Sequence, residues 1–158
     1  MRYSVPVAYS PPGGYDTKPD PILDGCTEPL PADAPDIRGT WETIEVMVEG
    51  EVVADHPGLG GVQRVEQAGN RVVVTGGGII HDMRCDGTEE NGVHDVAEFD
   101  KTTPIHLVAT YEDGVHVLRP LGQDIEVKRW RDGEHRMWQY LGYTARLRRI
   151  DVPPEGQG

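Results

Sequence analysis

Short runs of β-branched and aromatic residues alternate with turn signals along most of the chain. Gly, Asn or Asp separates consecutive runs in the segments VEGEV, EQAGNR, RCDGTEENGV, YEDGV and WRDGEH. This is the pattern of β-hairpins, and a spacing of about ten residues between turns is typical of sandwiches and barrels. We therefore predict strands over residues 39–48, 51–54, 62–67, 70–76, 79–85, 93–99, 105–111, 115–119, 125–131, 134–141 and 143–150.

Consecutive hairpins predict an up-and-down antiparallel meander. A meander of about eight to ten strands leaves two unpaired edges unless it closes into a barrel. Several strands are mixed on both faces: Ile105, Leu107 and Tyr111 alternate with His106 and Thr110. A barrel with a partly polar cavity produces that mixture, although it leaves open which face lines the interior. The fold class expected is an all-β, up-and-down, calycin-like barrel, with a short helix or a turn at residues 55–61 or 99–104.

The two ends of the chain differ from this pattern. Eight prolines between residues 1 and 36 exclude a long helix and a central strand there. Apolar residues within this Pro-rich arm indicate partial ordering against the body, and the arm is a candidate lid over the barrel mouth. We divide the chain into the arm at residues 1–36, a barrel domain at 37–150 and a loose tail at 151–158.

Charge and composition limit the partners. The chain has 158 residues, with 27 acidic against 15 basic side chains and a formal net charge of −12. This charge repels phosphate backbones and anionic lipid, so we expect neither nucleic acid nor a membrane as partner. The first residues lack the apolar run of a signal peptide, which favours a cytoplasmic protein. Cys26 and Cys85 have no metal-type spacing; we expect two reduced thiols, no metal and no cofactor, with a homodimer as a candidate assembly.

The segment GTWE, Gly39 to Glu42, opens the first long strand, and the last strand reads YTARLRRI. A Gly-x-Trp on the first strand, a hairpin meander and an Arg-rich final strand resemble the lipocalin and fatty-acid-binding (calycin) superfamily. The resemblance implies that Trp41 packs across the closed end of the barrel. It also implies that Arg146 or Arg148 covers the indole, since a guanidinium stacks well on an aromatic face.

Residues 76–100 hold the most unusual chemistry, with His-Asp pairs at His81 and at His94 on neighbouring predicted strands. Imidazoles beside carboxylates suit acid–base catalysis, and His81, His94 and Asp95 are the catalytic candidates. A shared metal is disfavoured because the two histidines are expected on different faces and no third ligand has a telling spacing. The glycine run 76–78 lacks the context of a phosphate loop and indicates a bulge or a sharp corner.

Other side chains are candidates for lining a cavity. Arg119, Arg129, Arg136 and Arg146 are alternative anchors for a ligand carboxylate, by bidentate pairing. Cys85 is expected to be a poor nucleophile, since an apolar and acidic neighbourhood raises the pKa of a thiol. The residues predicted to contact a ligand are Met83, His106, Tyr111, His116, Arg119, Trp138, Tyr140 and Tyr143.

Three functions fit these features. The first is binding of a small, largely apolar ligand in the barrel, with a carboxylate or another polar end as a candidate anchor point. The second is a cofactor-independent isomerase or cyclase, of the kind used in natural-product synthesis, with a cavity histidine or aspartate as acid or base. The third is a structural or interaction barrel with a filled core. An open, lined cavity would exclude the third.

Overall fold

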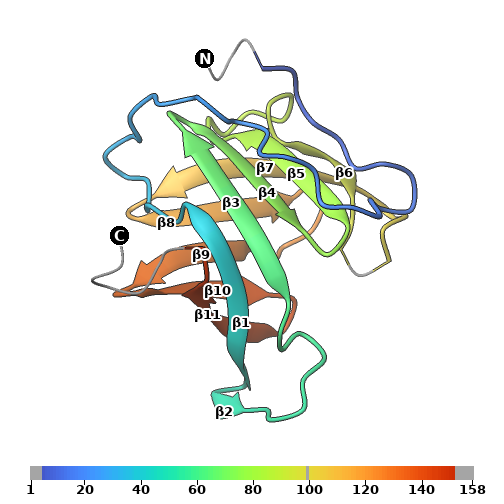
Figure 1. Cartoon of the computed structure of the whole chain (residues 1–158), viewed down its shortest axis with the longest axis vertical. Helices are drawn as coiled ribbons and strands as arrows, with labels where there is room; N and C mark the ends of the chain where they lie inside the picture. Colours follow the sequence, from blue (N-terminus) through green and yellow to red (C-terminus); the bar gives the residue numbers. More distant parts are fainter. Residues whose placement is uncertain (1–4, 99, 152–158) are drawn as a thin grey trace.

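The chain folds into one nearly closed antiparallel barrel (Figure 1). The structure is a computed structural model that describes residues 5–98 and 100–151. Ten strands follow in the order β5-β4-β3-β1-β11-β10-β9-β8-β7-β6, and β2 adds a short hairpin to β1. The strands are β1 (Gly39–Val48), β2 (Glu51–Val52), β3 (Val62–Ala68), β4 (Arg71–Gly76), β5 (Ile79–Arg84), β6 (Val93–Val96), β7 (Pro104–Glu112), β8 (Val115–Pro120), β9 (Val127–Asp132), β10 (His135–Tyr140) and β11 (Tyr143–Arg149).

The predicted fold class is confirmed. Each predicted strand has an observed counterpart, with ends that differ by a few residues; Phe99 and residues 152–158 lie outside the described part of the chain. The described residues form no helix. Of the short helix or turn expected at residues 55–61 or 99–104, the helix is therefore wrong. The described residues there form turns and irregular backbone, and Pro104 begins β7. In the glycine run, Gly77 and Gly78 have φ values of 59° and 89° and make the two-residue turn between β4 and β5. Such a turn needs residues that tolerate positive φ, which accounts for the glycines.

A bulge in β1 decides which of its residues face inward. The register against β11 shifts between Thr43 and Glu45, so Ile44 is the extra residue. A bulge reverses the alternation beyond it. Trp41, Thr43 and Val46 are buried, whereas Ile44 is exposed, although a regular strand would have placed it on the same face as Val46.

One end of the barrel is closed by the segment that precedes β1. Trp41 is fully buried inside, and its indole N–H donates to the Ile37 carbonyl oxygen at 3.0 Å. The amide of Gln67 holds this segment to the wall: its oxygen accepts from the Ile37 N–H, and its nitrogen donates to the Pro35 carbonyl and the Tyr111 hydroxyl. Trp41 is therefore held, fully buried, against the segment that lies at this end of the barrel.

The arginine predicted to cover Trp41 is a different one. Arg146 and Arg148 point outward from β11, where Arg146 pairs with Asp132 and Arg148 with Glu42. The guanidinium groups over the Trp41 ring come instead from β9 and β10, with Arg131 at 5.6 Å and Arg136 at 5.8 Å from its centroid. The alternation of β11 explains the difference, because Ala145 and Leu147 take the inward positions.

Gly39 leaves room for the Arg149 side chain at the same end. Its φ is 133°, and a Cβ there would clash with Nε of Arg149. Glycine adopts this positive φ without the strain that other residues would have, and the flexible Arg149 side chain lies against its backbone.

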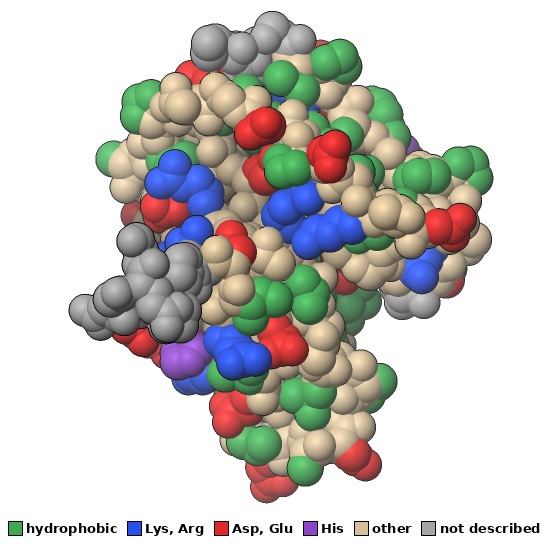
Figure 2. Space-filling model, viewed as in Figure 1, with side chains coloured by type: hydrophobic (Ala, Val, Ile, Leu, Met, Phe, Trp, Pro, Cys, Tyr) green, Lys and Arg blue, Asp and Glu red, His purple; other side chains and the backbone are tan. Residues whose placement is uncertain are grey.

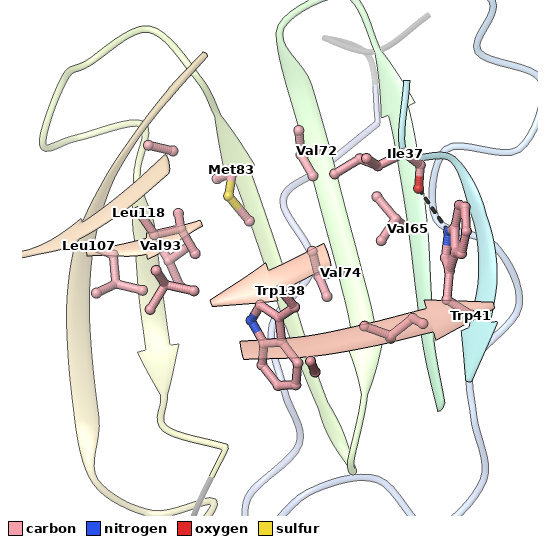
Figure 3. Packing of buried hydrophobic residues seen from close by; sticks show 14 of the residues in the cluster. Ile37, Trp41, Val65, Val72, Val74, Met83, Val93, Leu107, Leu118 and Trp138 are labelled. Carbon is pink, nitrogen blue, oxygen red and sulfur yellow. Dashed lines mark hydrogen bonds between the residues drawn. The ribbon is translucent and has the colours of Figure 1, made fainter. Parts of the chain in front are cut away.

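The hydrophobic core runs through the barrel from this end. Figure 3 shows Trp41 on one side of the cluster and Val93, Leu107 and Leu118 on the other, with Trp138 between them. All five are buried, and they come from both halves of the meander. The core therefore joins the first strands to the last ones and fixes the barrel's curvature.

The sheet is incomplete between β5 and β6, which share no continuous ladder in the described residues. Hydrogen bonds bridge this seam: the Arg84 N–H donates to the Asn91 carbonyl, and Nε2 of His81 lies 2.8 Å from the Val96 carbonyl. Ser10 of the arm lies beside the seam, where its hydroxyl accepts from the Ile80 N–H and its own N–H donates to Asp95. The arm therefore covers an edge that would otherwise expose unpaired backbone groups.

The arm packs on the outside of β3, β4 and β5 (Figure 1). Its described residues are not among those that line the pocket at the open end of the barrel. Leu23 packs there on Val73 and Ile80. A buried ion pair between Arg71 and Asp82, with 2.6 Å between Nη2 and Oδ2, adds polar contacts to the arm. Arg71 donates to the carbonyl oxygens of residues 5 and 6, and Asp82 accepts from the N–H of residue 8. The arm is thus part of the wall, in place of the predicted lid.

The outer surface carries both signs of charge. Figure 2 shows Lys and Arg side chains gathered near the middle of this face and acidic side chains around its lower tip, with hydrophobic groups scattered between. Both cysteines, Cys26 and Cys85, are free thiols, as predicted.

Asp82→Asn is expected to lower the free energy of unfolding by about 3–5 kcal/mol, because it removes the carboxylate that pairs with the buried Arg71 guanidinium. Urea unfolding followed by circular dichroism measures this change. Asp36→Asn is the matched control: its pair with Arg38 is exposed and should contribute less than about 1 kcal/mol. Equal losses in the two variants would show that the buried pair does not hold the arm and wall together.

Candidate ligand pocket

The end of the barrel opposite Trp41 opens into a pocket of about 370 Å³. Three loops and turns surround its mouth: the connection between β6 and β7, the connection between β8 and β9, and the turn between β10 and β11. Apolar side chains form most of its wall and mouth; they include Ala97, Pro104, Ile105, Leu107, Leu118, Leu121, Ile125, Val127 and Leu141. An apolar concave site of this size suits a small, largely apolar molecule.

The mouth exposes large apolar side chains to solvent. Leu121, Ile125 and Leu141 are 41%, 39% and 49% exposed, and all three line the pocket. Hydrophobic side chains gathered around a cavity mouth mark a surface that gains free energy when an apolar molecule covers it.

Arg129 provides a positive charge in this apolar setting. It points inward from β9, is 2% exposed and lines the pocket. Its guanidinium lies 5.4 Å from the ring centroid of Trp138, its cross-strand neighbour on β10. Within the described residues, its Nε and Nη1 atoms are buried and have no hydrogen-bond partner. Burying a guanidinium without hydrogen-bond partners lowers the stability of the folded state, so this group can gain free energy by binding an anion.

Arg136 and His116 lie deeper, on β10 and β8, the strands on either side of β9. Both are fully buried; Nη2 of Arg136 donates to the Gln63 side-chain oxygen at 2.6 Å, while its Nε and Nη1 lack partners in the described structure. Burial lowers the pKa of Arg136 well below its ordinary value, and the charge of Arg129 lowers it further. The interior therefore repels additional positive charge and attracts negative charge.

A single carboxylate balances part of this charge. Glu98, from the connection after β6, lines the pocket and acts on both arginines by its negative charge. Burial lowers the pKa of Arg129, and Glu98 opposes that effect. Sequence reasoning missed Glu98, because it lies in a connection whose pattern carries no sign of an inward-facing acid.

His81 is on the pocket wall as well. It is 5% exposed and shares the inward face of β5 with Ile79 and Met83. A carbonyl oxygen can only accept, so Nε2 of His81 carries the proton that bonds the Val96 carbonyl. In the neutral form of this imidazole the lone pair is then on Nδ1.

The other predicted site residues fall into separate groups. Six of the predicted ligand contacts lie within the barrel, where they belong to the hydrophobic cluster or pack against it. They are Met83, Tyr111, His116, Trp138, Tyr140 and Tyr143. His106 lines the rim of the pocket from the outer face of β7. Arg119 lies on the outside of β8, where Glu112 and Glu126 neutralise it, so it is not part of the site. Of the four predicted carboxylate anchors, the structure places Arg129 and Arg136 inside and Arg119 and Arg146 outside.

Two of the catalytic candidates are outside the pocket. His94 lies on the outer face of β6, with Nδ1 2.7 Å from Nδ1 of His106. Asp95 accepts from the Ser10 N–H and from its neighbour's N–H, which is a structural role at the seam. The structure therefore brings His81 to the pocket and leaves His94 and Asp95 away from it.

The remaining chemistry is limited. Burial raises the pKa of Cys85 far above its ordinary value, as predicted, so this thiol is a poor nucleophile. In the part of the chain that is described, no cluster of three or more His, Cys, Asp or Glu side chains is arranged to hold a metal ion. The same residues include no apolar helix of membrane-spanning length.

Comparison of the sequence with protein-family models and with curated proteins finds no match. The fold and the pocket are therefore the basis for inferring function.

His116 should make stability depend on pH. Burial lowers its pKa well below 6.5, and the charges of Arg129 and Arg136 act in the same direction. The unfolded chain takes up a proton near pH 6.5 and the folded chain does not, so stability falls as the pH drops below that value, by about 1.4 kcal/mol per pH unit.

His116→Gln should flatten this dependence in urea unfolding between about pH 7 and pH 5, whereas His135→Gln on β10 should leave it unchanged. A wild-type slope retained in His116→Gln would mean that this imidazole is not held neutral in the folded protein.

Proposed function

We propose that the barrel binds a small, largely apolar molecule that carries a negatively charged group. The observation that carries the proposal is the Arg129 guanidinium, which is buried at the pocket wall with two nitrogen atoms lacking partners in the described residues. A carboxylate, sulfonate or phosphate offers the oxygen pairs that a guanidinium binds. The apolar walls then cover the rest of the molecule, and the exposed side chains at the mouth become buried.

The charge balance supports an anion over a neutral ligand. Arg129 and Arg136 place two positive charges in the interior, and Glu98 supplies one negative charge at the pocket. A buried charge without a counter-ion destabilises the folded state, so an incoming anion gains more than a neutral molecule of the same shape.

A distant membership in the calycin superfamily is part of this proposal. It is supported by the up-and-down barrel, by Trp41 at the closed end and by the close approach of Gly39 to the last strand. The guanidinium groups over the indole come from other strands than the resemblance implied, which makes the relation a remote one.

Acid–base catalysis on the bound molecule is a second candidate. It is favoured by one observation, the buried His81 on the pocket wall with its lone pair on Nδ1. His81→Gln separates the two functions: it should leave the affinity for an apolar anion within about threefold, because the ring is not the anion's partner, while any turnover of that molecule would be lost.

Binding can be tested with two dyes of similar ring structure. The probe 1-anilinonaphthalene-8-sulfonate carries a negative charge, and N-phenyl-1-naphthylamine does not. Arg129→Met should weaken sulfonate binding by about 10- to 100-fold, since a hydrogen bond to a charged group contributes about 1.5–3 kcal/mol. Binding of the neutral dye should change little, and fluorescence titration measures both.

Arg119→Met is the matched control, because it removes the same charge from the outer surface. It should leave both dyes unaffected. Arg129→Met should also unfold at the same or a higher urea concentration than wild type, since an unpaired buried charge is replaced by an apolar chain. Equal weakening of both dyes would contradict the anion proposal and point to a packing role for Arg129.

A further inference from the structure

Two histidines face each other on the outside of the barrel. His94 on β6 and His106 on β7 are direct cross-strand partners. Their Nδ1 atoms are 2.7 Å apart, and their ring centroids are 5.0 Å apart. Both side chains are accessible to solvent at the surface. The antiparallel register therefore holds two imidazole nitrogens at a fixed, short separation.

The protons of this pair can be assigned from its partners. Nε2 of His94 lies 2.7 Å from the Glu89 carbonyl oxygen, which can only accept, so Nε2 carries a proton. In the neutral ring, Nδ1 of His94 is then the nitrogen with the lone pair. The contact between the two rings requires one proton, and that proton belongs to Nδ1 of His106. The lone pair of His94 is thus aimed at its neighbour before any ion arrives.

We propose that His94 and His106 form a two-histidine site for a divalent transition metal, bound through both Nδ1 atoms. The ion replaces the proton but lies to one side of the line between the two nitrogens, because the midpoint of that line is too close to both, and each ring turns its lone pair toward the ion. His106 then carries that proton on Nε2, so both rings stay neutral and each gives one lone pair to the ion. This proposal does not depend on ligand binding in the pocket.

The separation of the two nitrogens favours particular metals. Nitrogen ligands about 2.0 Å from one ion lie about 2.8 Å apart at a right angle and about 3.3 Å apart at a tetrahedral angle. The observed 2.7 Å is nearest to the right angle. Square-planar and tetragonal nitrogen sites select Cu²⁺ and Ni²⁺, and Cu²⁺ binds most strongly in the divalent series. We therefore expect Cu²⁺ to bind more tightly than Ni²⁺ or Zn²⁺.

The surroundings of the pair support this assignment. The Glu89 carbonyl fixes the tautomer and the orientation of His94, as outer-shell partners of metal-bound histidines do. The net charge of −12 attracts cations to the surface. The described residues contribute no third side chain to a cluster here, so water completes the coordination. His106 also lines the rim of the pocket, so the ion would lie beside the mouth.

The test uses the full chain, without an affinity tag and after removal of metal by a chelator. Titration with CuCl₂ at neutral pH, followed by calorimetry, should show one equivalent bound. Electron paramagnetic resonance should show coupling of the copper to nitrogen. His94→Gln and His106→Gln should each weaken binding by at least about tenfold, while His135→Gln on β10, the matched control, should bind like wild type.

Copper binding that is unchanged in both His94→Gln and His106→Gln would overturn the proposal, as would the absence of binding to wild type. A measurement on the wild-type chain guards against variants that fail to fold. In nitrogen NMR spectra of the histidine rings, substoichiometric Cu²⁺ should broaden the signals of His94 and His106 first. Broadening that begins at other histidines would place the ion elsewhere and would also overturn the proposal.

Discussion

Trp41 and the segment before it close one end of the barrel, and the character of the interior depends on that closure. The indole bonds the Ile37 carbonyl, and Gln67 ties the same segment to Tyr111 on the opposite side of the meander. In the described part of the chain, Trp41 and Ile37 are fully buried at this end, and the pocket opens at the other. An apolar interior that opens at one end has a low local dielectric constant, which strengthens the electrostatic interactions of every charge inside it.

The low dielectric constant affects two buried arginines in particular. Arg129 and Arg136 occupy inward positions where an aliphatic side chain would pack without loss of hydration. A purely structural barrel does not require them, because buried ionic groups are often replaced by apolar residues without loss of stability. Under the proposed function, the presence of these arginines beside an apolar pocket means that stability is given up for recognition, which is common at functional sites.

The sequence was sufficient to predict the strands, because Gly, Asn and Asp mark nearly every turn of the meander. It could not predict which face of each strand is inside. On β10, Arg136 and Trp138 alternate with His135 and Met137, and neither set is clearly the more apolar. The choice is made by closure of the whole barrel, which fixes the register of every strand together.

For the same reason Arg129 could be named only as one of four candidate anchors, and Arg119 on the next strand faces outward. The position of Glu98 and the pairing of His94 with His106 could not be predicted from the sequence either. Both depend on how the chain connects β6 to β7 and on a cross-strand register that no local pattern encodes.

The seam between β5 and β6 explains why a long Pro-rich arm belongs to this fold. A ladder that stops short of closure leaves donors and acceptors of two strands unpaired. The arm occupies that place: Ser10 bonds Ile80 on one strand and Asp95 on the other, and the Arg71–Asp82 pair holds the chain a few residues away. Proline suits this role, because it cannot continue a sheet and so prevents further strands from adding to the edge. The arm therefore completes the wall by side-chain bonds where backbone pairing ends, and the pocket mouth stays open to solvent.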